Sequence, residues 1–159
     1  MLRDVLAGNE TIVVFLEDNT RAASRVRRLD ELTREHGQRT EESRNGHGKA
    51  NQGLRMRDIM HVNLGLLPSS RGSWGTAWDI ASHAPQTWFH VHENVGMADI
   101  EAKKDEIREW FGGQTVKDSI QFDVYVEHVE LVKTFAPGVW HCVFDLYVTR
   151  QMDAADNIT

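Results

Sequence analysis

Histidine, cysteine and carboxylate side chains are the residues of this 159-residue chain that could do chemistry, so their spacing is considered first. His90 and His92 alternate on one face of a predicted strand, a spacing that can place two imidazoles on one metal ion. His83 lies upstream and could be a third ligand. The alternative is a strand with histidines on its wetter face, which we favour because no metal-binding motif accompanies the pair. We therefore expect no metal and no cofactor.

The single cysteine and the paired carboxylates do not form an active site either. Cys142 alternates in phase with Trp140 and Phe144, which predicts a buried, unreactive thiol. Glu41 and Glu42 lie in a polar segment without apolar neighbours that could raise a carboxyl pKa. We expect a protein without catalytic residues, that is, not an enzyme.

The charge of the chain is divided into two blocks. The net charge is -6, yet residues 20–57 hold ten basic and five acidic residues, against eight basic and nineteen acidic elsewhere. Such polarity suggests a nucleic-acid contact or an oppositely charged partner, although a solvated helix with arginines facing water is an equal alternative. Exposed tryptophans can anchor an interface, although burial in the core is equally compatible with the Gly/Ser-rich segment around them. The predicted partner contacts are Arg39, Arg44, His47, Lys49, Arg55, Arg57, Trp74 and Trp78.

The apolar pattern of the N-terminal third predicts a strand, a helix and a loop. The β-branched run Glu10–Leu16 reads as a short buried strand, and a helix capped by Asn19 or Thr20 should reach His36, with Gly37 as its stop. Residues 38–53 contain a single apolar side chain and cannot offset the entropy of ordering. We expect a projecting, flexible polar loop there.

The rest of the chain alternates between strand and helix patterns. Alternation predicts strands from about Met60 to Leu66, over residues 86–93, and in a hairpin of residues 119–132 and 140–149 with a bulge near His128 and a Pro-Gly turn. An apolar stripe predicts a helix over residues 97–111, stopped by two glycines. Residues 75–83 fit no single pattern, and residues 153–159 should fray.

These elements predict a single α+β domain over residues 1–159. It would hold a mainly antiparallel sheet of four or five strands, two helices packed on one face and the long projecting loop. No apolar run is long enough to span a membrane, and the N-terminus lacks a signal-peptide pattern. A single cysteine excludes a disulfide scaffold and indicates a reducing compartment.

The C-terminal hairpin resembles the end of tail-terminator and related neck proteins of long-tailed, siphovirus-like viruses. In that family a helix precedes a strand, a turn with a glycine and an aromatic residue, and a closing strand. Here the helix of residues 97–111, the turn Pro137-Gly138-Val139-Trp140 and the strand of residues 144–149 occupy those places. The resemblance covers roughly the last sixty residues.

The resemblance implies a structural virion protein that forms a homo-oligomeric ring, commonly a hexamer, at the junction of tail and neck. Such a ring terminates the tail tube, contacts the tail-tube and neck or connector proteins, and lets DNA pass. It would be assembled in the host cytoplasm. A head–tail connector protein is the alternative within this class, and a nucleic-acid-binding module using the Arg-rich residues 21–57 is the alternative from another class.

Overall fold

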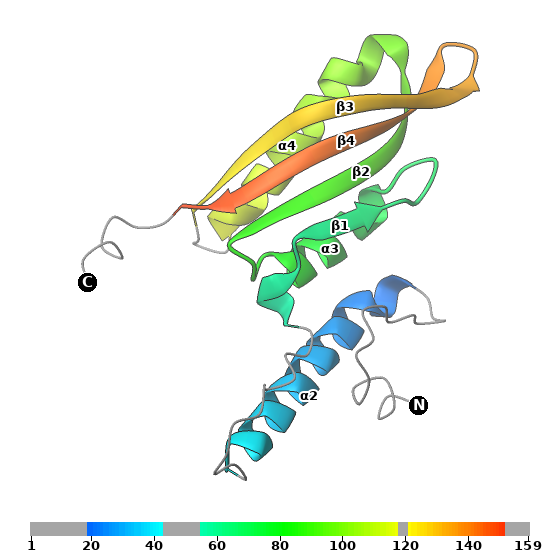
Figure 1. Cartoon of the computed structure of the whole chain (residues 1–159). Helices are drawn as coiled ribbons and strands as arrows, with labels where there is room; N and C mark the ends of the chain where they lie inside the picture. Colours follow the sequence, from blue (N-terminus) through cyan, green and yellow to red (C-terminus); the bar gives the residue numbers. More distant parts are fainter. Residues whose placement is uncertain (1–18, 43–54, 118–120, 152–159) are drawn as a thin grey trace. The chain divides into compact units, whose positions relative to one another are not determined.

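The computed structural model describes residues 19–42, 55–117 and 121–151 (Figure 1). The chain divides into two units, Met1–Met56 and Arg57–Thr159, and each is described by itself.

The first unit contains the long helix α2, Ala22–Glu42, preceded by a 3-10 turn, Asn19–Arg21. The helix continues five residues beyond the predicted stop at Gly37, because one glycine costs a helix only about 1 kcal/mol and good helix formers follow it. Residues 38–42 of the predicted loop are therefore helical. The rest of that loop and the predicted strand over residues 10–16 lie outside the described residues.

The second unit is built on a four-stranded sheet (Figure 1). Its strands are β1, His61–Leu64, β2, Gln86–Gly96, β3, Phe122–Ala136, and β4, Val139–Arg150, in the order β1-β2-β4-β3. Strand β1 pairs with β2 in parallel, whereas β4 is antiparallel to both β2 and β3. The predicted α+β class is confirmed. Over the described residues the sheet has four strands, within the predicted four or five, and it is mixed because one pairing is parallel.

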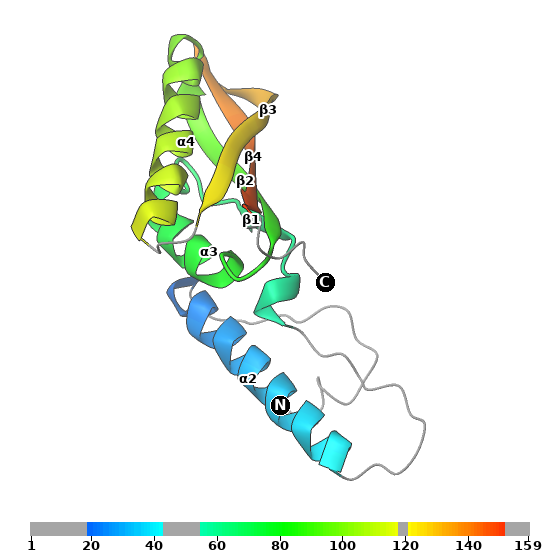
Figure 2. The same cartoon turned by 90° about the vertical axis from the view of Figure 1, so that its left-hand side faces the viewer.

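Helices α3, Trp74–Ala81, and α4, Ile100–Lys117, both cover the same face of the sheet (Figure 2). With α2 they make three α-helices in the part of the chain that the structure describes, where two were predicted. Short 3-10 turns occupy Met56–Asp58, Arg71–Ser73 and Met97–Asp99. The ambiguous segment is thus a helix that connects β1 to its parallel neighbour β2. Completely buried aromatic rings fill the layer between helices and sheet, among them Trp74, Phe89, Phe111 and Phe144.

Helix α4 does not end at Gly112-Gly113 as predicted. It runs to Lys117, and a Cβ at either glycine would meet no atom within 4 Å, so no close packing requires these glycines. The side chain of Thr115 donates a hydrogen bond to the Gly112 carbonyl at 2.8 Å within this last part of the helix. None of the described helices is long and apolar enough to cross a membrane.

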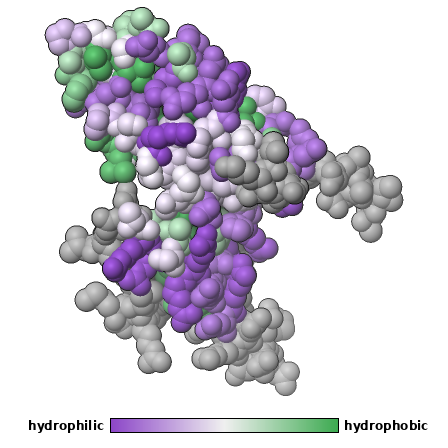
Figure 3. Space-filling view, turned by 180° about the vertical axis from the view of Figure 1, so that it is seen from behind, coloured by the Kyte–Doolittle hydropathy of each residue, from purple (hydrophilic) through white to green (hydrophobic). Residues whose placement is uncertain are grey.

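The C-terminal hairpin has the predicted shape. Its register shifts between Val126 and His128, which confirms the bulge, and Gly138 has a φ of +75°, as the third position of a type II turn requires. Seen from the helix side, hydrophobic residues gather at the far end of the hairpin, whereas the outer face of α4 is hydrophilic (Figure 3). The exposed apolar residues of this end are Leu131, Val132 and Phe135.

Candidate functional site at the carboxyl end of strand β1

The segment that follows β1 lies where open α/β sheets bind their ligands, outside the carboxyl ends of parallel strands. All residues of this segment, residues 65–69, are exposed, and we call it the β1 loop. It includes two neighbouring leucines, Leu66 and Leu67, which are 46% and 45% exposed. Exposed apolar side chains beside the polar amide of Asn63 form a surface suited to contact with a ligand or partner.

Hydrogen bonds attach the β1 loop to strand β2. Glu93 is 2% exposed, and its Oε1 accepts hydrogen bonds from the backbone N–H of Ser70 at 2.8 Å and from the Ser70 hydroxyl at 2.9 Å. The Ser70 Oγ in turn accepts a hydrogen bond from the indole N–H of Trp74 at 2.9 Å. The backbone N–H of Asn94 donates to the Pro68 carbonyl at 2.9 Å. Two successive residues of β2 therefore hold the carboxyl end of a short exposed segment, whose amino end continues directly from β1.

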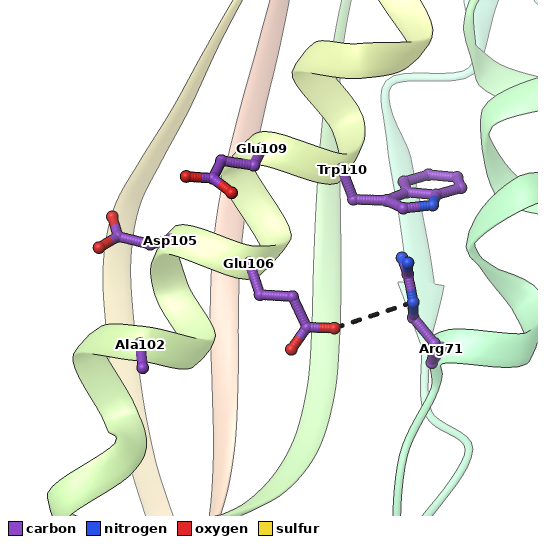
Figure 4. Close-up of a pocket in the computed structure, with 6 residues that line it drawn as sticks. All are labelled: Arg71, Ala102, Asp105, Glu106, Glu109 and Trp110. Carbon is purple, nitrogen blue, oxygen red and sulfur yellow. Dashed lines mark ion pairs between the residues drawn. The ribbon is translucent and has the colours of Figure 1, made fainter.

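Arg71 continues this anchorage toward helix α4 (Figure 4). Its guanidinium lies 4.4 Å from the ring centre of Trp74 and 5.1 Å from that of Trp110, and its Nε is 3.8 Å from Glu106 Oε1. Arg71, Glu106 and Trp110 border an open groove of about 560 Å³, lined also by Ala102, Asp105 and Glu109. Stacking on the two indole rings and the ion pair with Glu106 therefore hold the side chain of Arg71 in place.

Histidines occupy the sheet face opposite the helices. His90 Nδ1 lies 2.7 Å from Asp145 Oδ1, and His90 Nε2 lies 3.1 Å from His61 Nδ1. The His61 and His90 ring centres are 5.4 Å apart, about two ring radii more than the nitrogens, so the nitrogens point directly at each other. Two imidazoles that bind one metal ion converge on it at an angle, whereas these two nitrogens face each other along the line that joins them. The pair is a hydrogen bond within an Asp145–His90–His61 chain.

His92 and His141 form a second imidazole pair nearby. Their facing nitrogens are 3.0 Å apart and their ring centres 5.2 Å, so this contact is also a hydrogen bond. Burial lowers the pKa of His92 below 6.5, and the neighbouring His141 and His90 lower it further, while Asp145 opposes them. His83, the third candidate ligand, lies beyond α3, and no group of three potential ligands occurs among the described residues.

Only some of the residues predicted to contact a partner lie in the part of the chain that the structure describes. Trp74 and Trp78 are 0% and 4% exposed in the core, so the burial alternative holds for both. Arg55 is half-buried, and Arg57 is exposed with its Nε 3.8 Å from Asp58 Oδ1. Arg39 belongs to α2, but its side chain is outside the described set, as are Arg44, His47 and Lys49 entirely.

The thiol of Cys142 is buried between sheet and helices, as its alternation predicted, and burial raises its pKa. The residues that sequence reasoning missed are Ser70 and Glu93. A signal was present, since Glu93 alternates in phase with the apolar Phe89 and Val91. A carboxylate on the buried face of a strand requires hydrogen-bond donors, and that requirement indicates a built contact.

The chain is similar to proteins of tRNA modification. It is 32% identical over 139 residues to tRNA wybutosine-synthesizing protein 2 of Schizosaccharomyces pombe and 33% identical over 110 residues to the protein of that name of Saccharomyces cerevisiae. The match covers 87% and 62% of this chain, which spans about a quarter of each relative, 26% and 24%. No family model matches the chain.

Two solved structures named TYW2 are also similar to this chain. M. jannaschii TYW2 in complex with AdoMet is 19% identical, with a TM-score of 0.48 over 65% of this chain and 48% of that one. P. horikoshii TYW2 in complex with MeSAdo is 24% identical, with a TM-score of 0.45 over 62% of this chain and 37% of that one.

The similarities to the two yeast proteins overturn the viral interpretation. The resemblance to tail-terminator and neck proteins is wrong, and with it the structural role in a virion, the hexameric ring, the tail-tube and connector partners and the passage of DNA. The expectation of a non-enzymatic protein is overturned as well, because both relatives are named as tRNA wybutosine-synthesizing proteins. An alternating hairpin specifies two antiparallel strands with one buried face, and many unrelated folds contain that pattern.

Proposed function

We propose that this chain is a part of an enzyme of wybutosine synthesis on tRNA, and that its β1 loop borders the site where the substrate is held. The observation that carries the proposal is the 32% identity to the S. pombe wybutosine-synthesizing protein across 87% of the chain. The position of the β1 loop supports it, because this exposed segment follows a parallel strand and is anchored to β2 at its carboxyl end.

The chemistry of the β1 loop suits binding and orientation. It offers backbone groups, the Asn63 amide and the apolar side chains of Leu66 and Leu67, and none of these exchanges a proton near neutral pH. Holding two reactants in a productive geometry can itself lower a barrier by several kcal/mol, about 7–11 in favourable cases. A segment that contributes to an enzyme by holding the substrate therefore needs no nucleophile or base of its own.

The solved M. jannaschii protein is in complex with AdoMet, a small molecule that would need a site of its own in this enzyme. Small-molecule sites enclose roughly 70–90% of a ligand's surface. The β1 loop is exposed and can cover one side of such a ligand, and the described residues alone do not fit a complete AdoMet site. No reaction step is assigned to that group.

A chimera tests the proposal. In S. pombe cells lacking their own tRNA wybutosine-synthesizing protein 2, that protein would be expressed with its 139 matched positions replaced by those of this chain. We expect wybutosine to reappear in digested tRNA, measured by mass spectrometry of nucleosides. A matched chimera whose residues 65–69 are replaced by glycine and serine should fold but yield little wybutosine. A soluble, folded first chimera that makes none would contradict the proposal.

A further inference from the structure

We infer that Glu93 is a positioning residue, which sets the conformation of the β1 loop through Ser70. The inference rests on the proposed function, since it names the group that holds the substrate-facing segment in place. The side chain of Glu93 acts on the loop through Ser70, which accounts for both described hydrogen bonds to its carboxyl group.

Glu93 occupies a place where an apolar side chain would otherwise be expected. The residues two positions before and after it on the same face of β2, Val91 and Val95, are buried at 0% and 4% exposure, and Glu93 itself is at 2%. Burying a carboxyl group is costly unless donors compensate for the lost water. Both described donors to its Oε1 come from one residue, Ser70, so the compensation depends on the position of that residue.

Ser70 uses every polar group it has. Its N–H and hydroxyl proton go to Glu93, and its Oγ accepts the Trp74 indole N–H. Its carbonyl accepts both the hydroxyl and the backbone N–H of Ser73, at 2.7 and 2.9 Å. These five hydrogen bonds, at 0% exposure, hold Ser70 in one position. The position at which the β1 loop ends, just before Ser70, is therefore fixed.

The two loop residues just before Ser70 are held by backbone contacts to β2. The Asn94 N–H bonds to the Pro68 carbonyl at 2.9 Å, and Ser69 forms an isolated antiparallel bridge with Glu93. Backbone pairing places the loop next to β2, and the carboxyl group fixes its final orientation. Removal of the Glu93 carboxyl group should leave this backbone pairing intact but allow Ser70, at the carboxyl end of the loop, to move.

The test compares three variants of the chimera, each with purified protein and tRNA. Glu93→Gln keeps an acceptor oxygen for both Ser70 donors, whereas Glu93→Ala removes it. We expect kcat within about threefold of the parent for Glu93→Gln and at least about tenfold lower for Glu93→Ala, with a smaller change in KM, since misplaced groups slow the chemical step. Val148→Ala, a buried truncation in β4 opposite Thr87 at the amino end of β2, is the control for stability and should retain kcat.

A second measurement does not depend on activity. In the full chain of 159 residues, amide hydrogen exchange of Ser70, whose N–H donates to Glu93, should become at least about tenfold faster in Glu93→Ala, while Val148→Ala leaves it close to the parent. Unchanged exchange of the Ser70 amide, or a Glu93→Gln variant as slow in kcat as Glu93→Ala, would overturn the inference. An inactive parent chimera with the expected exchange pattern would count against the proposed function and in favour of the positioning role.

Discussion

Replacing Ser70 with alanine should destabilise the chain far more than the same change at the adjacent serine. Ser70 is 0% exposed, and its Oγ both donates to Glu93 at 2.9 Å and accepts from the Trp74 indole at 2.9 Å. Ser69 is exposed, and its Oγ only accepts the Arg71 N–H at 3.2 Å. The two substitutions remove the same atoms from neighbouring positions.

The magnitude follows from the groups left without a partner. A buried donor that loses its acceptor costs about 1–3 kcal/mol, and the Trp74 indole N–H becomes such a donor in Ser70→Ala. The buried carboxyl group of Glu93 loses one of its two described donors, which adds about 1 kcal/mol, while the Ser70 N–H contact survives. The expected loss is about 2–4 kcal/mol for Ser70→Ala and below about 0.5 kcal/mol for Ser69→Ala.

Urea unfolding of the full chain, followed by circular dichroism, measures both losses. The midpoint should shift strongly for Ser70→Ala with little change in the slope of free energy against urea, because the surface exposed on unfolding is the same. A loss below about 1 kcal/mol for Ser70→Ala would refute the view that this serine is the anchor of the β1 loop.

Other features give further expected outcomes. The buried thiol of Cys142, whose pKa burial raises, should react with a thiol reagent at pH 8 only at the rate of unfolding, and rapid labelling of the native chain would contradict its burial. The pKa of His92 is lower in the folded chain than its ordinary 6.5, so the unfolded chain binds the proton more tightly. The stability due to neutral His92 is complete above about pH 6.5 and falls as the pH drops below it, and His92→Gln should flatten unfolding free energies measured between pH 7.5 and 5.5. Gly138→Ala should cost about 1–2 kcal/mol in thermal or urea unfolding because φ is +75°, whereas equal stability would exclude strain at this turn. Arg71→Lys keeps the charge but loses the planar stacking on Trp74, and should reduce stability nearly as much as Arg71→Ala.

Local pattern was a good guide to individual elements of this chain. Alternation predicted strand β2 and both strands of the C-terminal hairpin, and the slip of phase at His128 located a real bulge. These features depend on which face of one strand is buried, and the sequence records that directly. The buried position of Cys142 followed from the same periodicity.

The pairing of strands and the class of protein were not accessible from pattern. The parallel contact of β1 with β2 depends on the crossover helix α3, which is only eight residues long and begins beside glycine and serine. Its helical period is too short to separate it from a loop, so the connection was missed. The hairpin gave a wrong family because its alternation reports burial alone. The Ser70–Glu93 contact was missed because it joins residues 23 positions apart, which no local pattern connects.

The order of the strands has a consequence for how the chain is made on the ribosome. Strand β4 is synthesised after β2 and β3, yet it lies between them, and neither pairs with the other. Until residues 139–150 leave the exit tunnel, both strands present unpaired backbone toward the vacant centre, and Phe144 and Leu146 are absent from the core. Stepwise, vectorial folding of this unit is therefore disfavoured, because one of the two central strands of its sheet arrives last. Nascent chains stalled before Val139 should be sensitive to protease and should recruit chaperones, and protection should appear in a single step once β4 is inserted.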